Sequence, residues 1–139
     1  MINKQNFNKH HFVIAMLYLL PFIALYTISK LFFNEIYLFN WLNDRWYLCL
    51  WIIVILAAYK QKYLIATSLT IGNIFAVIIG QFCGDFIRIR NIHSITEIMS
   101  NEERARLHLH YGVPIWIITV LTFTLIGIGM DILHKKSKK

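Results

Sequence analysis

Charged residues in this chain stand mainly at the ends of long apolar runs, and this placement constrains the fold more than any motif does. Residues 113–133, for example, contain a single charged side chain, Asp131. A helix needs about 20 apolar residues to cross the hydrocarbon core of a bilayer. Helices and closed barrels are the structures that satisfy all backbone hydrogen bonds there. Only 15% of the residues are charged, against about a quarter in soluble domains, so the runs predict membrane-spanning helices.

Four runs fit such spans, and the second is the weakest because its strictly apolar part is short. The second and third are separated only by a three-residue turn, Lys60–Lys62, which forces them to run antiparallel. We therefore expect an all-α integral membrane protein in one domain, residues 1–139, with four transmembrane helices arranged as two antiparallel hairpins. The expected spans are residues 12–33, 40–59, 63–83 and 113–133.

Residues 84–112 form the one substantial polar segment, and we expect an ordered outer loop with a short interfacial helix. Ser100 and Glu103 have the spacing of a capping box, which predicts a helix beginning there. Gly112 is expected to end this helix in the left-handed conformation. A second capping-box match at residues 94–97 predicts a turn before the helix.

Basic residues indicate the orientation, because cytoplasmic segments carry an excess of them. Six of the seven acids and all five arginines lie on the side of residues 84–112. We expect a multi-pass plasma-membrane protein with both termini in the cytoplasm. The distribution also argues against nucleic acid as a partner despite the net charge of +7, since a nucleic-acid binder gathers its basic residues on one folded face. The lysines of the expected cytoplasmic side are Lys4, Lys9, Lys60, Lys62, Lys135, Lys136, Lys138 and Lys139.

Motifs of known catalytic chemistry are missing from the sequence. It contains no G-x-S-x-G, P-loop or H-E-x-x-H pattern. Cys49 and Cys83 do not form a C-x-x-C pair, so we expect them to be buried as small hydrophobic residues. These observations favour a non-enzymatic role while leaving an enzyme open.

The third run carries a small residue at every fourth position. Such a ridge lets two membrane helices approach closely, and it predicts a tight helix–helix contact. The partner is left open between another span of this chain, a second copy and a different protein. The residues of this small-residue ridge are Ser68, Gly72, Ala76, Gly80 and Gly84.

A polar ridge, Asn73, Gln81 and Asp85, follows the neighbouring face of the same helix. Polar groups inside a membrane need partners and often mark a pathway. One hypothesis is an outward-facing polar pocket with Asp85 as its charge; the other is a set of interhelical hydrogen bonds with an ion pair from Asp85 to Arg88. The further candidate binding residues lie in the outer segment: Arg90, Glu103, Arg104, Arg106, His108 and His110.

The pair His108 and His110 raises the question of a metal or haem. We expect both to lie at the end of a helix, where residues two apart point away from each other, so the pair alone does not chelate. A metal site would need a further ligand brought in by the tertiary structure, His93, Asp85 or Glu103. We expect no cofactor, and keep a metal or haem site at His93, His108 or His110 as an alternative.

Three functional hypotheses remain for this chain. The first is a non-enzymatic accessory or partner-binding subunit of a membrane complex. The second is a small solute or ion transporter or channel component with a polar path at Asn73, Gln81 and Asp85. The third is a metal- or haem-linked redox subunit. The expected partners are the lipid bilayer and either further copies of the chain or another membrane subunit.

Overall fold

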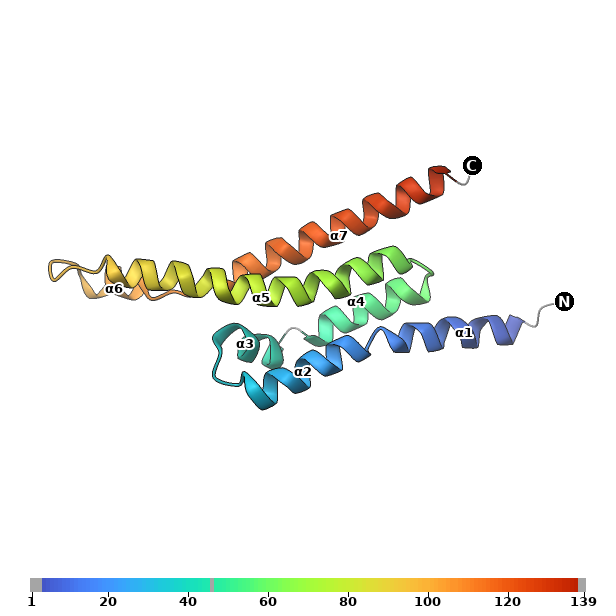
Figure 1. The fold of residues 1–139 in the computed structure, drawn as a ribbon, viewed down its shortest axis with the longest axis horizontal. Helices are drawn as coiled ribbons and strands as arrows, with labels where there is room; N and C mark the ends of the chain where they lie inside the picture. Colours follow the sequence, from blue (N-terminus) through green and yellow to red (C-terminus); the bar gives the residue numbers. More distant parts are fainter. Residues whose placement is uncertain (1–3, 46, 138–139) are drawn as a thin grey trace.

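The computed structural model describes residues 4–45 and 47–137, and the side chains of 11–44 and 49–137. Every element in the described part is an α-helix, which confirms the all-α prediction (Figure 1). The side chains of Lys4, Lys9, Lys138 and Lys139 lie outside the described part. The helices are α1 (Lys4–Leu17), α2 (Leu20–Phe32), α3 (Tyr37–Arg45), α4 (Tyr47–Tyr59), α5 (Tyr63–His93), α6 (Asn101–Leu107) and α7 (Gly112–Ser137).

The first expected span is two helices in close succession. Pro21 lies in the first turn of α2, where its missing N–H is harmless. Its ring clashes with the carbonyl of the residue four positions earlier, which is Leu17, and α1 ends there. Taken together, His11–Phe32 remain long and apolar enough to cross a membrane.

The second expected span, residues 40–59, is bent. Tyr37–Asp44 and Cys49–Tyr59 meet at an angle of 68°. The apolar helix α4 has 13 residues, about 20 Å at 1.5 Å per residue, which is shorter than a hydrocarbon core of roughly 30 Å. Within the described residues, three helical segments are therefore long and apolar enough to span a membrane, or four when the bent pair counts as one span.

The turn between α4 and α5 is as short as the sequence predicts. Gln61 adopts a left-handed conformation with φ 61°, and its N–H donates to the carbonyl of Ala58. α5 then continues ten residues past the expected end of its span at Cys83, to His93. The expected loop is therefore helical over its first third. Cys83 and Cys49 are both exposed, so the expectation that they are buried is wrong.

α6 begins where the capping box predicts. The Ser100 hydroxyl accepts from the Glu103 N–H at 3.3 Å, and the Glu103 carboxylate accepts from the Ser100 N–H at 2.9 Å. The match at residues 94–97 forms no capping box, since the Ser94 hydroxyl donates backward to the Asn91 carbonyl. The prediction for Gly112 is also wrong: it begins α7, and its φ is not positive.

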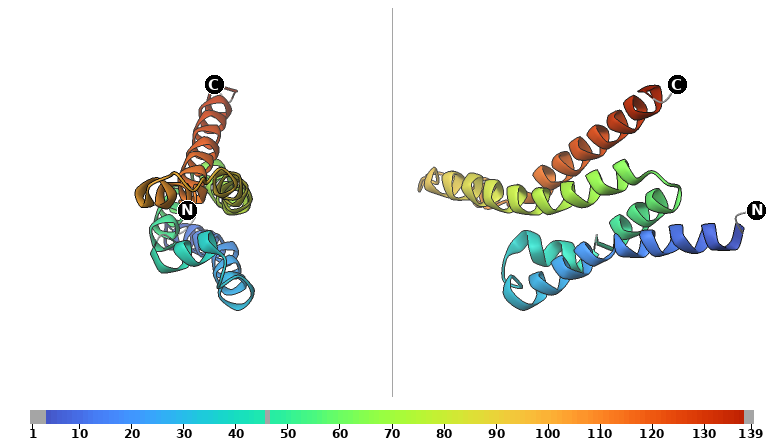
Figure 2. Two further views of the ribbon diagram at one scale, coloured as in Figure 1. Left: turned by 90° about the vertical axis from the view of Figure 1, so that its left-hand side faces the viewer. Right: turned by 45° about the vertical axis from the view of Figure 1, so that its right-hand side comes forward.

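α5 is the central helix of the bundle. Its first part packs between α4 and α7, while α1 covers the far side of α4 (Figures 1 and 2). The last part of α5 extends beyond the other helices, and α6 folds back along it. Both ends of the described chain lie at the opposite end of the bundle. Large apolar side chains such as Phe32, Ile118 and Leu125 are exposed, as expected of helices that face lipid.

The small-residue ridge of α5 faces α7 of the same chain. A Cβ built on Gly80 would lie 2.8 Å from the carbonyl oxygen of Gly112, and one built on Gly127 would lie 2.8 Å from the Cβ of Ser68. Gly72 lies against Phe123, and Gly84 lies against Gly112. Ala76 is fully buried between these contacts. The two antiparallel backbones can approach this closely because side chains are missing at the contact points.

Candidate binding site between α2, α3 and α5

The polar ridge of α5 does not form a continuous path. Asn73, the deepest of its residues, is 1% exposed, and its side-chain oxygen accepts a hydrogen bond from the indole N–H of Trp116 at 3.1 Å. Both side chains are buried in the contact between α5 and α7. Asn73 therefore links two helices rather than lining a cavity.

Gln81 accepts a hydrogen bond from a backbone N–H in the first turn of α3. Its side-chain oxygen accepts from the backbone N–H of Leu38 at 2.9 Å, and its Nε2 donates to Asp85 Oδ2 at 2.6 Å. Leu38 lies in the first turn of α3, where backbone N–H groups have no partner within their own helix. Gln81 supplies that partner from α5 and at the same time orients Asp85.

His110 accepts a hydrogen bond from a backbone N–H in the first turn of α7, as Gln81 does in α3. Its Nδ1 accepts from the Gly112 N–H at 3.0 Å, so the ring proton is on Nε2, which lies 3.1 Å from Asp85 Oδ1. The ring is neutral in this arrangement, since a nitrogen that accepts a hydrogen bond carries no proton. It is 4% exposed and packs against the ring of Tyr37 at 4.5 Å between centroids.

Asp85 is the member of this hydrogen-bond network that keeps unused acceptor positions. It accepts one hydrogen bond on each oxygen, from Gln81 and from His110, yet its side chain is 44% exposed. A carboxylate offers about four acceptor positions, so about two are unused. The expected ion pair with Arg88 is not formed: among the described residues, none of the ion pairs includes Arg88.

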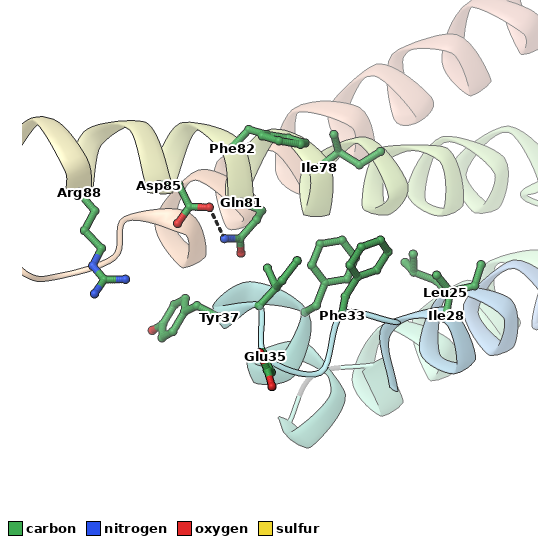
Figure 3. A pocket seen from close by; sticks show the side chains of 12 residues that line it. Leu25, Ile28, Phe33, Glu35, Tyr37, Ile78, Gln81, Phe82, Asp85 and Arg88 are labelled. Atoms are coloured by element: carbon green, nitrogen blue, oxygen red, sulfur yellow. Dashed lines mark hydrogen bonds between the residues drawn. The ribbon is translucent and has the colours of Figure 1, made fainter. Parts of the chain in front are cut away.

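The open side of Asp85 faces a cavity of about 610 Å³ (Figure 3). Asp85, Gln81 and Arg88 project from one side of α5 toward the turn that carries Tyr37. The rest of the wall is apolar and comes from α2, α3 and the middle of α5. The lining residues are Leu25, Ile28, Phe33, Glu35, Ile36, Tyr37, Phe39, Ile78, Gln81, Phe82, Asp85 and Arg88.

The other candidate residues lie around the hairpin of α5 and α6. Arg104 donates to the carbonyls of Thr96 and Glu97 at 3.2 and 2.9 Å, and so holds the turn before α6. Glu103 belongs to the capping box, and its hydrogen bonds to the backbone and the hydroxyl of Ser100 hold its pKa below the usual value. Arg90 and Arg106 are exposed.

The histidines are dispersed. His93 ends α5, and His108 is the C-terminal cap of α6. His108 thus lies at the end of a helix as expected, whereas His110 lies in the segment between α6 and α7, so the expectation is wrong for His110. In residues 4–45 and 47–137, no three His, Cys, Asp or Glu side chains form a group that could hold a metal ion. Both ring nitrogens of His110 are already used, one by the Gly112 N–H and the other by the Asp85 carboxylate.

The opposite end of the bundle holds the one acid expected there. Asp131 on α7 lies 2.7 Å from the ammonium of Lys62 and 2.9 Å from that of Lys135. Lys62 belongs to the turn between α4 and α5, so this contact ties the turn to the end of α7. Asp131 is therefore paired with two lysines at this end of the bundle.

Sequence reasoning missed the parts of the site that come from distant segments. The Leu38 N–H and Trp116 contact polar groups of α5, and Tyr37 contacts the ring of His110, each from a position more than 25 residues away. The spacing of His110 and Gly112, an acceptor two residues before a helix start, is the one local signal available.

Comparisons with known proteins give no information on function, so the functional argument rests on the geometry of the site. No protein-family model, no curated protein and no solved structure matches the chain.

Proposed function

We propose that this chain is a non-enzymatic accessory subunit of the plasma membrane that binds a protein partner through the hairpin of α5 and α6. The orientation proposed with it places both termini in the cytoplasm and the hairpin outside. Residues 84–93 of α5 extend about 15 Å along the helix axis, far enough to reach a partner beyond the lipid surface.

The observation that carries the proposal is the side chain of Ile98, which is 97% exposed at the tip of the hairpin. Both arms of the hairpin carry exposed charged side chains, Arg90 on α5 and Glu102 and Arg106 on α6. An apolar anchor inside a charged rim is the arrangement found at protein interfaces. Arg104 and the capping box hold the hairpin in one conformation before binding, which lowers the entropy lost on association.

The test is native mass spectrometry of the full chain extracted gently from its own membrane. The proposal expects a second polypeptide at fixed stoichiometry, lost in Ile98→Ser and retained in Leu109→Ser. Leu109 is a matched control because it is exposed on the same side of the protein but away from the tip. A chain that extracts alone, or only with copies of itself, contradicts the proposal, as does a partner that both variants retain.

A second candidate function is a small solute or ion transporter component, favoured by the carboxylate of Asp85 on the cavity wall. Flux into vesicles containing the purified protein tests it, with Asp85→Asn expected to abolish the flux. The hydrogen bond between Asn73 and Trp116 closes the inner part of the polar ridge, so transport requires that bond to open. Flux that is unchanged in Asp85→Asn excludes this candidate.

A further inference from the structure

We propose that the cavity between α2, α3 and α5 binds a phospholipid whose headgroup carries a primary ammonium next to its phosphate, the phosphatidylethanolamine type. The acyl chain lies along the apolar wall, the ammonium lies on Asp85 and the phosphate lies on Arg88. This inference does not depend on the protein partner proposed above, since it concerns a different surface and predicts a lipid of known mass.

The long apolar wall argues for an acyl chain. Leu25 and Ile28 of α2 face Ile78 of α5 across the cavity, with Phe33 and Phe82 beside them (Figure 3). A volume of about 610 Å³ is in the usual range for a small-molecule site. Amphiphiles fit this wall better than small polar solutes do, because a polar molecule would find few hydrogen-bond partners on an apolar wall.

The cavity opens sideways, toward the region that lipid occupies. Phe82 is 72% exposed, and Ile28 and Ile78 are each 44% exposed although they line the cavity. They lie on α2 and α5, within two of the segments that are apolar enough to span a membrane. A lipid can therefore enter from the bilayer without its chain crossing water.

The polar end carries one negative and one positive group that do not neutralise each other. Asp85 has only neutral hydrogen-bond donors, Gln81 and the His110 ring, and Arg88 takes part in none of the ion pairs of the described residues. Side chains three apart on a helix are neighbours, about 5–6 Å between Cβ atoms. Glu35 also lines the cavity but points away from α5 (Figure 3), so Asp85 and Arg88 are the two charges that α5 presents to the cavity, and as a pair they match a zwitterion.

The unused acceptor positions of Asp85 select among zwitterionic headgroups. A primary ammonium has three N–H donors and can fill both of the open positions, whereas a quaternary choline has none. The Arg88 guanidinium suits a phosphate because it presents paired N–H donors. Asp85 and Arg88 together disfavour an anionic headgroup without an ammonium, since Asp85 would repel its charge.

The experiment measures which lipid the full chain retains. The purified protein is placed in vesicles with equal parts of dioleoyl phosphatidylethanolamine, phosphatidylcholine and phosphatidylglycerol, extracted, and examined by native mass spectrometry. We expect one phosphatidylethanolamine to be retained preferentially. Glycerophosphoethanolamine, which has the headgroup without acyl chains, should not displace it.

Paired variants separate the headgroup from the chain. Asp85→Asn should lower the preference for phosphatidylethanolamine over phosphatidylcholine about tenfold, the change given by about 1.4 kcal/mol. Arg88→Gln should weaken retention of both lipids, while Arg90→Gln, an exposed arginine outside the cavity, should not. Ile78→Trp should fill the cavity and remove the bound lipid, and Ile79→Trp, one residue outside the lining, should leave it.

Three results would overturn the proposal. They are equal retention of the three lipids, a preference for phosphatidylglycerol, and retention that is the same in Arg88→Gln and Arg90→Gln. Arg88→Gln keeps the test decisive if Asp85→Asn or Ile78→Trp fails to fold, because the Arg88 side chain makes no hydrogen bond or ion pair with the described residues. If no protein partner is found but the preference for phosphatidylethanolamine is intact, the accessory function is refuted and the lipid proposal is not.

Discussion

Replacing Gly80 by alanine tests whether the contact between α5 and α7 depends on close backbone approach. The new Cβ would lie 2.8 Å from the Gly112 carbonyl oxygen and 2.8 Å from Cδ2 of Leu38. Ordinary carbon–oxygen contacts begin at about 3.3 Å, so α7 must move by about 0.5 Å. Leu38 is fully buried and has little room to yield. Overpacking of this kind costs about 1–3 kcal/mol.

Gly129→Ala on α7 is the matched control, because a Cβ there meets nothing within 4 Å. Both substitutions gain the same helix propensity of about 1 kcal/mol. The difference in the free energy of unfolding between them therefore isolates the packing, and we expect Gly80→Ala to be less stable than Gly129→Ala by about 1–3 kcal/mol. The assay is a titration of the micelle-bound protein with sodium dodecyl sulfate, followed by circular dichroism. Equal midpoints for the two variants would refute the close-approach argument.

Three further predictions concern the turn, the opposite end of the bundle and α6. Gln61→Gly should raise the free energy of unfolding by about 1 kcal/mol, because the left-handed φ of 61° is unfavourable for a residue with a Cβ, and Gln61→Val should lower it in the same titration. Asp131→Asn should speed amide hydrogen exchange in the turn that carries Lys62, with a smaller difference from wild type at high salt; unchanged exchange would mean that the ion pair contributes nothing. The lowered pKa of Glu103 predicts that the capping box stabilises α6 above the usual value of 4.5 and loses this contribution as the pH falls through the lowered pKa. The protection factors of the α6 amides, which compare each exchange rate with the intrinsic rate at the same pH, should thus fall on acidification in wild type and depend less on pH in Glu103→Gln, and parallel profiles would contradict the assignment.

Local features of the sequence were sufficient for the helical class and for several details. The capping box at Ser100 and Glu103 forms because its two hydrogen bonds depend only on a four-residue segment. The anchoring pair at Asp131 follows from an acid placed among lysines at one end of the bundle. The end of α5 was missed because a span boundary is not a helix boundary. The polar residues after Cys83 continue the helix until Ser94 caps it.

Gly112 shows why the site itself could not be predicted from the sequence. A glycine near a helix end serves either a positive φ or a close backbone approach, and the local sequence favours the first use. The structure has the second, because Gly112 packs against Gly80 and Gly84 of a distant helix. The same contact brings His110 next to Asp85. No local pattern contains this information, since 25 residues separate the two side chains.

A polar ridge on a membrane helix is evidence of a binding site only where hydrogen-bonding capacity remains after folding. On α5 the three ridge residues have different partners although all lie at multiples of four positions from one another. Asn73 is joined to Trp116, and Gln81 is occupied by Leu38 and Asp85. Asp85 alone of the three keeps acceptor positions open to a cavity, and Arg88 lies one turn further with its charge unpaired among the described residues. Since buried partners have already used Asn73 and Gln81, the lipid recognition proposed for this site depends on the charges of Asp85 and Arg88.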